Sequence, residues 1–105
     1  MNKQNEETAK IKEIVESRLP GAKVVLFGSR ARGDFDEKSD YDLLIITKDK
    51  KTIGEKIQIS ETLRDSFSQF LIPTDIIIKS EDEVDYFRDK IGSVVREALK
   101  EGLTI

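Results

Sequence analysis

The 105-residue chain contains no cysteine and no histidine. The absence of cysteine excludes disulfides, thiolate chemistry and zinc ribbons, and it fits a cytoplasmic protein. The absence of histidine excludes a Ser-His-Asp hydrolase, a three-histidine zinc enzyme and a histidine proton shuttle. Any acid–base or metal chemistry must therefore come from carboxylates, lysine or tyrosine.

The chain also lacks a long apolar segment and a strong excess of charge of either sign. No apolar run approaches the roughly 18 residues of a membrane span, and the polar start MNKQNEETAK has no signal-peptide core. Lysine and arginine number 18 against 21 aspartates and glutamates, which leaves a net charge of −3. We therefore expect a cytoplasmic protein that neither enters a membrane nor binds nucleic acid directly.

Short apolar runs alternate with longer segments of helical periodicity. The predicted elements are a helix over 11–19, strands over 24–27 and 43–46, a helix over 53–71, a strand over 76–78 and a helical stretch over 84–98 that Gly92 splits. Ser80 and Glu83 have the spacing of a capping box before the last stretch. This order predicts a single α/β domain over 1–105, a two-layer sandwich whose sheet of about three strands is flanked by helices.

The turn after the first predicted strand carries features of a phosphate site. Gly28 allows close approach of the backbone to a ligand, and Ser29 adds a hydroxyl donor. Arg30 and Arg32 follow, and guanidinium groups match phosphate oxygens. Gly28 and Gly33 have the spacing that opens a Walker A loop, but Asp-Phe follows where Lys-Ser or Lys-Thr is required.

Three aspartates stand at the starts of the next two predicted strands. Asp40 and Asp42 are two residues apart, so their side chains project from the same face of a strand. Asp75 begins the third strand, and all three carboxylates would converge if the second and third strands are neighbours. Carboxylates in this arrangement favour Mg²⁺ together with substrate phosphates. Taken singly, each of these residues also fits an ordinary solvated turn, so their joint order carries the prediction.

Gly28-Ser29, ten intervening residues and Asp40-x-Asp42 match the G-S-x₁₀-D-x-D signature of the polymerase-beta-like nucleotidyltransferase superfamily. The string FGSRARG…SDYDLLI resembles its small members, the minimal nucleotidyltransferases. Asp75 in TDIII fits their third acid, and the ending EALKEGLTI resembles their C-terminal helix. The resemblance covers most of the chain and implies a mixed sheet flanked by helices.

The resemblance also implies roles for individual residues. Gly28 and Ser29 would bind the triphosphate of an NTP, with Arg30 assigned to the nucleotide and Arg32 left as an alternative. Asp40, Asp42 and Asp75 would hold Mg²⁺ and form the catalytic set. In these implied roles, Asp75 would activate the attacking hydroxyl as a base or as a ligand of a second metal ion.

The acceptor is not encoded in any motif of the chain. Small members of this family are commonly encoded with a HEPN-domain ribonuclease toxin, and the resemblance implies an antitoxin that transfers AMP from ATP to a tyrosine of that toxin. A complex of the two proteins would be a hetero-oligomer. Two alternatives stay open: a module that neutralises its partner by contact alone, and a nucleotidyltransferase that acts on a small molecule.

Overall fold

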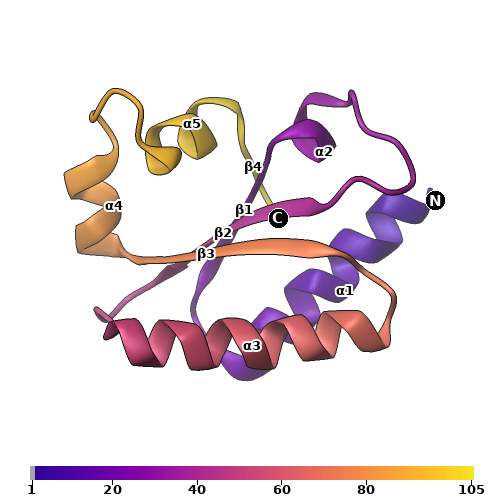
Figure 1. The fold of residues 1–105 in the computed structure, drawn as a ribbon, viewed down its shortest axis with the longest axis horizontal. Coiled ribbons are helices and arrows are strands. Elements are labelled where there is room, and N and C mark those ends of the chain that lie inside the picture. The colour runs from indigo at the N-terminus through magenta and orange to yellow at the C-terminus, as the bar shows by residue number, and fades with distance from the viewer. Residues whose placement is uncertain (1) are drawn as a thin grey trace.

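A computed structural model of the protein describes residues 2–105, and its helices lie on both faces of one sheet (Figure 1). The elements are α1 (Lys3–Arg18), β1 (Lys23–Phe27), α2 (Ser29–Arg32), β2 (Tyr41–Thr47), α3 (Ile53–Gln69), β3 (Thr74–Ser80), α4 (Glu81–Phe87), α5 (Val94–Glu101) and β4 (Leu103–Thr104). The sheet order is β3-β2-β1-β4. Among residues 2–105, no helix is both long and apolar enough to cross a bilayer.

The sheet is mixed, as the resemblance implied. β2 pairs with β3 in parallel, whereas β1 runs antiparallel to both β2 and β4. The carboxyl end of β1 therefore lies beside the amino ends of β2 and β3. The predicted count of about three strands was one short, because the two-residue strand β4 is too brief to show a periodic pattern.

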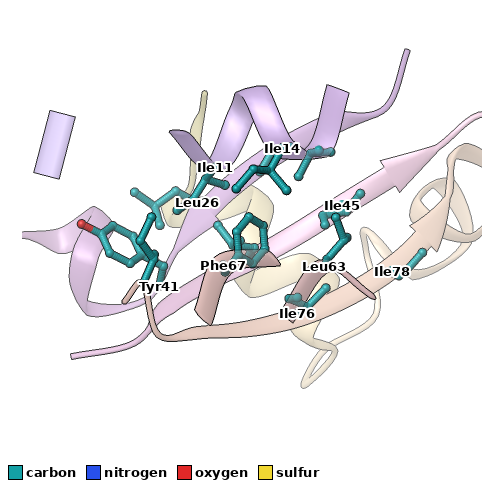
Figure 2. Packing of buried hydrophobic residues seen from close by; sticks show 13 residues of the cluster. Ile11, Ile14, Leu26, Tyr41, Ile45, Leu63, Phe67, Ile76 and Ile78 are labelled. Atoms are coloured by element: carbon teal, nitrogen blue, oxygen red, sulfur yellow. The ribbon is translucent and has the colours of Figure 1, made fainter. Parts of the chain in front are cut away.

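The larger core lies between the sheet and the helices α1 and α3 (Figures 1 and 2). Ile11 of α1, Phe67 of α3 and Leu43 of β2 are fully buried in it. Tyr41 is also fully buried, and its hydroxyl donates a 2.9 Å hydrogen bond to Oε1 of Glu7. This core anchors β2 and β3 on the face of the sheet that α1 and α3 cover, because every second side chain of the strands points into it.

The smaller core lies on the opposite face, under α4 and α5. Val95 and Ala98 of α5 pack there against the apolar side chains of β1 and β2. The same face of β2 carries Asp42, because residues two apart share a face. The end of α5 is thereby brought close to the amino end of β2.

The predicted helical stretch over 84–98 divides near Gly92, as expected. Gly92 adopts φ +84° between α4 and α5, and the neighbouring Ile91 is 89% exposed. The capping box of Ser80 and Glu83 is present at the start of α4. The first helix begins at Lys3, earlier than predicted, because the Asn2 side chain caps it by accepting from the Asn5 N–H.

Candidate active site

The site is built where three strand ends meet. In the sheet register, Asp42 of β2 lies directly opposite Phe27 of β1 on one side and Asp75 of β3 on the other. Two of the three predicted carboxylates are therefore cross-strand neighbours on the same face. The condition on which the sequence prediction depended, that the second and third strands are adjacent, is met.

The carboxylate of Asp42 is electrostatically crowded. Partial burial raises its pKa, and the negative charges of Asp75 and Asp40 raise it further. Arg32 acts in the opposite direction, and Glu101 adds to the rise. Like charges opposite one another destabilise a sheet, so a bound cation would reduce the repulsion between the carboxylates of Asp42 and Asp75.

Asp40 precedes β2 and is exposed, as is Asp75. Within residues 2–105, no three acidic side chains are already gathered closely enough to form a complete cage for a metal ion. Mg²⁺ does not require one, since it usually takes one or two carboxylates and completes its shell with phosphate oxygens and water. The adjacent pair Asp42 and Asp75, with Asp40 two residues upstream, fits this kind of site.

Gly28 lies against the carboxylate of Asp42. It is buried at the end of β1, and its backbone has φ +71° and ψ −155°, a conformation that side chains disfavour. A Cβ atom at this position would overlap Oδ2 of Asp42. Glycine is thus required twice, once by the backbone conformation and once by the close approach to an acidic side chain.

Ser29, the next residue, is the first residue of α2 and is half-buried. Its position immediately after Gly28 places it at the same strand end as Asp42. The predicted phosphate-binding pair therefore lies beside Asp42 in the fold, although the turn over 33–39 separates them in the chain.

Arg30 is buried and holds that turn together. Its guanidinium lies 4.4 Å from the ring centres of both Phe35 and Tyr41. Nε and Nη2 donate to the carbonyl oxygen of Ser39 over 3.2 and 3.0 Å, and Nη1 donates to the side chain of Gln4 over 3.3 Å. With an exposed fraction of 6%, this side chain is committed to protein groups, and its predicted contact with the nucleotide stays a prediction.

Arg32 is exposed and faces the carboxylates. Its Nε donates to Asp34 over 3.3 Å, and its Nη1 lies 3.2–3.3 Å from the two carboxylate oxygens of Glu101. Both acidic partners raise its pKa. Of the two arginines that the sequence left as alternatives, Arg32 is the one whose charge acts on Asp42.

Glu101 at the end of α5 is a site-proximal residue that the sequence did not single out. Its Oε1 accepts a 2.9 Å hydrogen bond from the Gly28 N–H, across 73 residues of chain. A glutamate near the end of an amphipathic helix has no distinguishing pattern. Only the packing of α5 on β1 brings it to Gly28.

A hollow beside the site does not contain the three aspartates. It has a volume of about 520 Å³ and is lined by Asn2, Lys3, Gln4, Glu7, Arg30, Phe35, Asp36 and Glu37. It lies on the other side of the Arg30 turn, beside the start of α1. The carboxylates themselves lie at the amino ends of β2 and β3, where Asp40 and Asp75 are exposed and Asp42 is half-buried.

Comparisons with known sequences point to one family. The profile described as nucleotidyltransferase domain matches residues 8–103. A proposed protein adenylyltransferase of Methanocaldococcus jannaschii is 41% identical over 68 residues, which are 65% of this chain and 63% of that protein. A second one from the same organism is 53% identical over 47 residues, 40% of this chain and 46% of that protein. The chain matches less than two thirds of the length of either relative.

Solved structures share the fold. A chain of a toxin–antitoxin complex with AMP-PNP has a TM-score of 0.62 at 17% identity, covering 91% of this chain and 69% of that one. The complex of a tri-AMPylated Shewanella oneidensis HEPN toxin with its MNT antitoxin gives 0.59 at 15%, covering 96% and 70%. A proposed nucleotidyltransferase from Sulfolobus solfataricus gives 0.55 at 29%, covering 94% and 76%.

Proposed function

We propose, because this chain belongs to the nucleotidyltransferase domain family, that it transfers AMP from ATP to a tyrosine of a HEPN-type toxin and so acts as an antitoxin. The family is the one that the Gly28-Ser29 and Asp40-x-Asp42 motif predicted. The observation that carries the proposal is the direct pairing of Asp42 with Asp75 beside Gly28. Acidic groups are held there on one face of the sheet, next to Gly28, whose missing side chain leaves room for the Asp42 carboxylate.

In this proposal the triphosphate of ATP binds at Gly28 and Ser29, and Arg32 contributes positive charge toward the phosphates. Arg32 is preferred over Arg30 because its guanidinium is exposed, while that of Arg30 is buried between two rings. Mg²⁺ held by Asp40, Asp42 and Asp75 would neutralise phosphate charge as it redistributes during the reaction. The raised pKa of Asp42 supports this, since the crowding of negative charge favours a cation.

The acceptor hydroxyl attacks the α-phosphorus of ATP, and a new P–O bond forms as the bond to the β-phosphate oxygen breaks. Pyrophosphate leaves with the electron pair of that bond. Asp75, exposed at the start of β3, accepts the proton of the hydroxyl in its role as base. The remaining residues act by positioning the phosphates and stabilising their charge.

The acceptor is assigned from two lines of support. Both Methanocaldococcus relatives are named as proposed protein adenylyltransferases, and the fold matches chains of two toxin–antitoxin complexes. Asp40 and Asp75 are exposed, which also suits a side chain presented by a folded protein. Small-molecule transfer is placed second, because the names of both relatives point to a protein acceptor.

The test uses the full chain with Mg²⁺ and the product of the adjacent reading frame. ATP labelled at the α-phosphate should label the partner on tyrosine, whereas ATP labelled at the γ-phosphate should not. Asp42→Asn should abolish labelling, and Asp65→Asn, an exposed acid on α3, should not. Absence of α-label on the partner, with the two proteins bound to each other, would reject AMP transfer to that partner.

A second function, neutralisation of the partner by contact alone, is favoured by exposed apolar side chains. Leu71 and Ile91 are 87% and 89% exposed, and Tyr86 is 64% exposed. Large exposed apolar groups are common at protein interfaces. Asp42→Asn separates the two functions, because it keeps these surfaces intact: continued protection of cells by the variant supports contact alone.

A further inference from the structure

The carboxylate of Glu101 contacts two groups of the proposed triphosphate site at once. One oxygen accepts from the Gly28 N–H over 2.9 Å, and both oxygens lie within 3.3 Å of Nη1 of Arg32. The side chain of Glu101 is 27% exposed, so these contacts are partly shielded from water. Hydrogen bonds that involve an ionised group are stronger than neutral ones.

The position of Glu101 is fixed by the segment that follows it. Gly102 is packed so tightly that a Cβ atom would overlap the Ala98 carbonyl and the Val25 side chain. Leu103 and Thr104 then pair with β1, and the N–H of Ile105 donates to the carbonyl of Val24 over 3.0 Å. The carboxylate is therefore held by the sheet and does not depend on a freely moving helix end.

Both backbone polar groups of Gly28 are hydrogen-bonded. Its N–H donates to Glu101, and its carbonyl accepts from the N–H groups of Ala31 and Arg32, each over 3.0 Å. Because its backbone has positive φ and its Cα touches the carboxylate of Asp42, a small rotation here would move the Gly28-Ser29 backbone relative to Asp42.

We propose that Glu101 is a positioning residue, which fixes the Gly28 peptide and the Arg32 guanidinium in the geometry that receives the nucleotide phosphates. This inference rests on the proposed function and deepens it. Glu101 does not contact the reacting atoms. It acts through Gly28 and Arg32, so its loss should weaken nucleotide binding more than it slows the chemical step.

The opposite role for Glu101, competition with the nucleotide phosphates, predicts a change in ATP affinity of the opposite sign. A carboxylate on Arg32 also occupies a donor that phosphate could use, and its negative charge raises the pKa of Asp42. If Glu101 were a competitor, its removal would tighten ATP binding. Positioning should prevail because Glu101 supplies the acceptor for the Gly28 N–H, a buried backbone donor that would otherwise lose its partner.

The first measurement needs no nucleotide. Amide hydrogen exchange at Gly28 should be slow in the wild-type protein and at least about tenfold faster in Glu101→Ala, since the variant loses the acceptor. Glu101→Gln keeps one acceptor oxygen and should retain most of the protection. Glu97→Ala, an exposed site one turn earlier on α5, is the matched control and should leave exchange at Gly28 unchanged.

The second measurement is the affinity for ATP with Mg²⁺, together with transfer kinetics. Glu101→Ala should raise Kd and KM by about five- to tenfold while kcat falls no more than about twofold, with Glu101→Gln intermediate. In an Arg32→Met background, the same substitution should change Kd less, because part of its effect passes through Arg32. Glu97→Ala should match the wild type.

The outcomes distinguish a failure of this inference from a failure of the proposed function. A wild-type protein that binds ATP but transfers nothing rejects the proposed transfer and leaves the Glu101 measurements valid. A wild-type protein that transfers AMP, with Glu101→Ala binding ATP equally or more tightly, overturns the positioning role alone. Unchanged exchange at Gly28 in folded Glu101→Ala also overturns it, and a wild-type protein that binds no ATP rejects both.

Discussion

Charged groups are arranged in opposite ways at the two ends of the β2–β3 pair: like charges are adjacent at one end, and opposite charges are paired at the other. At the amino end, Asp42 and Asp75 are direct neighbours and repel each other. At the carboxyl end, the carboxylate of Glu83 accepts from the Ser80 N–H over 2.9 Å and from Lys56 over 2.9–3.1 Å. Burial opposes ionisation there, but these hydrogen bonds lower the pKa of Glu83 to about 2.

The difference supports the proposal that the amino end is the catalytic one. The carboxyl end satisfies its polar groups internally, with a capping box and a largely shielded ion pair, so it contributes to stability. The amino end leaves like charges side by side, and such an arrangement persists only if something else requires it. Four predictions test this contrast, in order of decreasing effect.

Asp75→Asn should lower kcat for AMP transfer by about 100- to 10,000-fold, because the amide cannot accept the proton of the attacking hydroxyl. Asp75 is exposed, so the variant should fold normally. Affinity for ATP should change far less than kcat. Single-turnover labelling alongside a binding isotherm measures both. An active Asp75→Asn protein would show that Asp75 is not the base.

Gly28→Ala should both weaken ATP binding and reduce the free energy of unfolding by about 2 kcal/mol, since the methyl group would overlap the carboxylate of Asp42. Gly33→Ala is the matched control. Gly33 also has positive φ, at +91°, but no atom lies within 4 Å of the added carbon, so only the conformational cost of about 1 kcal/mol remains. Equal losses in the two variants would mean that the contact with Asp42 is unimportant.

Much of this arrangement could be predicted from sequence. Local patterns predicted the strands over 24–27, 43–46 and 76–78, and the capping box of Ser80 and Glu83 was predicted from its spacing alone. Each depends on residues a few positions apart. Alternation also predicted that Asp40 and Asp42 share one face; Asp40 lies just before β2, so this stays a prediction.

The remainder depends on contacts between distant segments. Arg30 is buried and Arg32 is exposed, although both lie in the short helix α2, because Phe35 and Tyr41 cover Arg30. The contact of Glu101 with Gly28 spans 73 residues and arises from the docking of α5. Ile53 and Ile91, apolar residues of the helical stretches predicted over 53–71 and 84–98, are 79% and 89% exposed, because apolar spacing does not reveal whether a second layer covers the segment.

At the carboxyl end, Glu83→Gln should lower the free energy of unfolding at pH 7 by about 1–2 kcal/mol and leave transfer unchanged. Its folded-state pKa is depressed from 4.5 to about 2, so the stabilisation is present above pH 4.5 and disappears as the pH falls toward 2. Denaturant titrations of both proteins should therefore converge in that interval. A difference that persists unchanged to pH 2 would contradict the role of the ionised carboxylate.

At the amino end, Asp42→Asn should raise the melting temperature of the metal-free protein by roughly 2–4 °C at pH 7. The folded state raises the pKa of Asp42, so its ionised form costs stability above that pKa, and the amide removes the repulsion by Asp75 and Asp40. Asp65→Asn should shift it by less than about 1 °C. Saturating Mg²⁺ and ATP should reverse the order, because only the wild type gains from binding. A variant that melts lower than the wild type without metal would mean that the crowded carboxylates are not a source of instability.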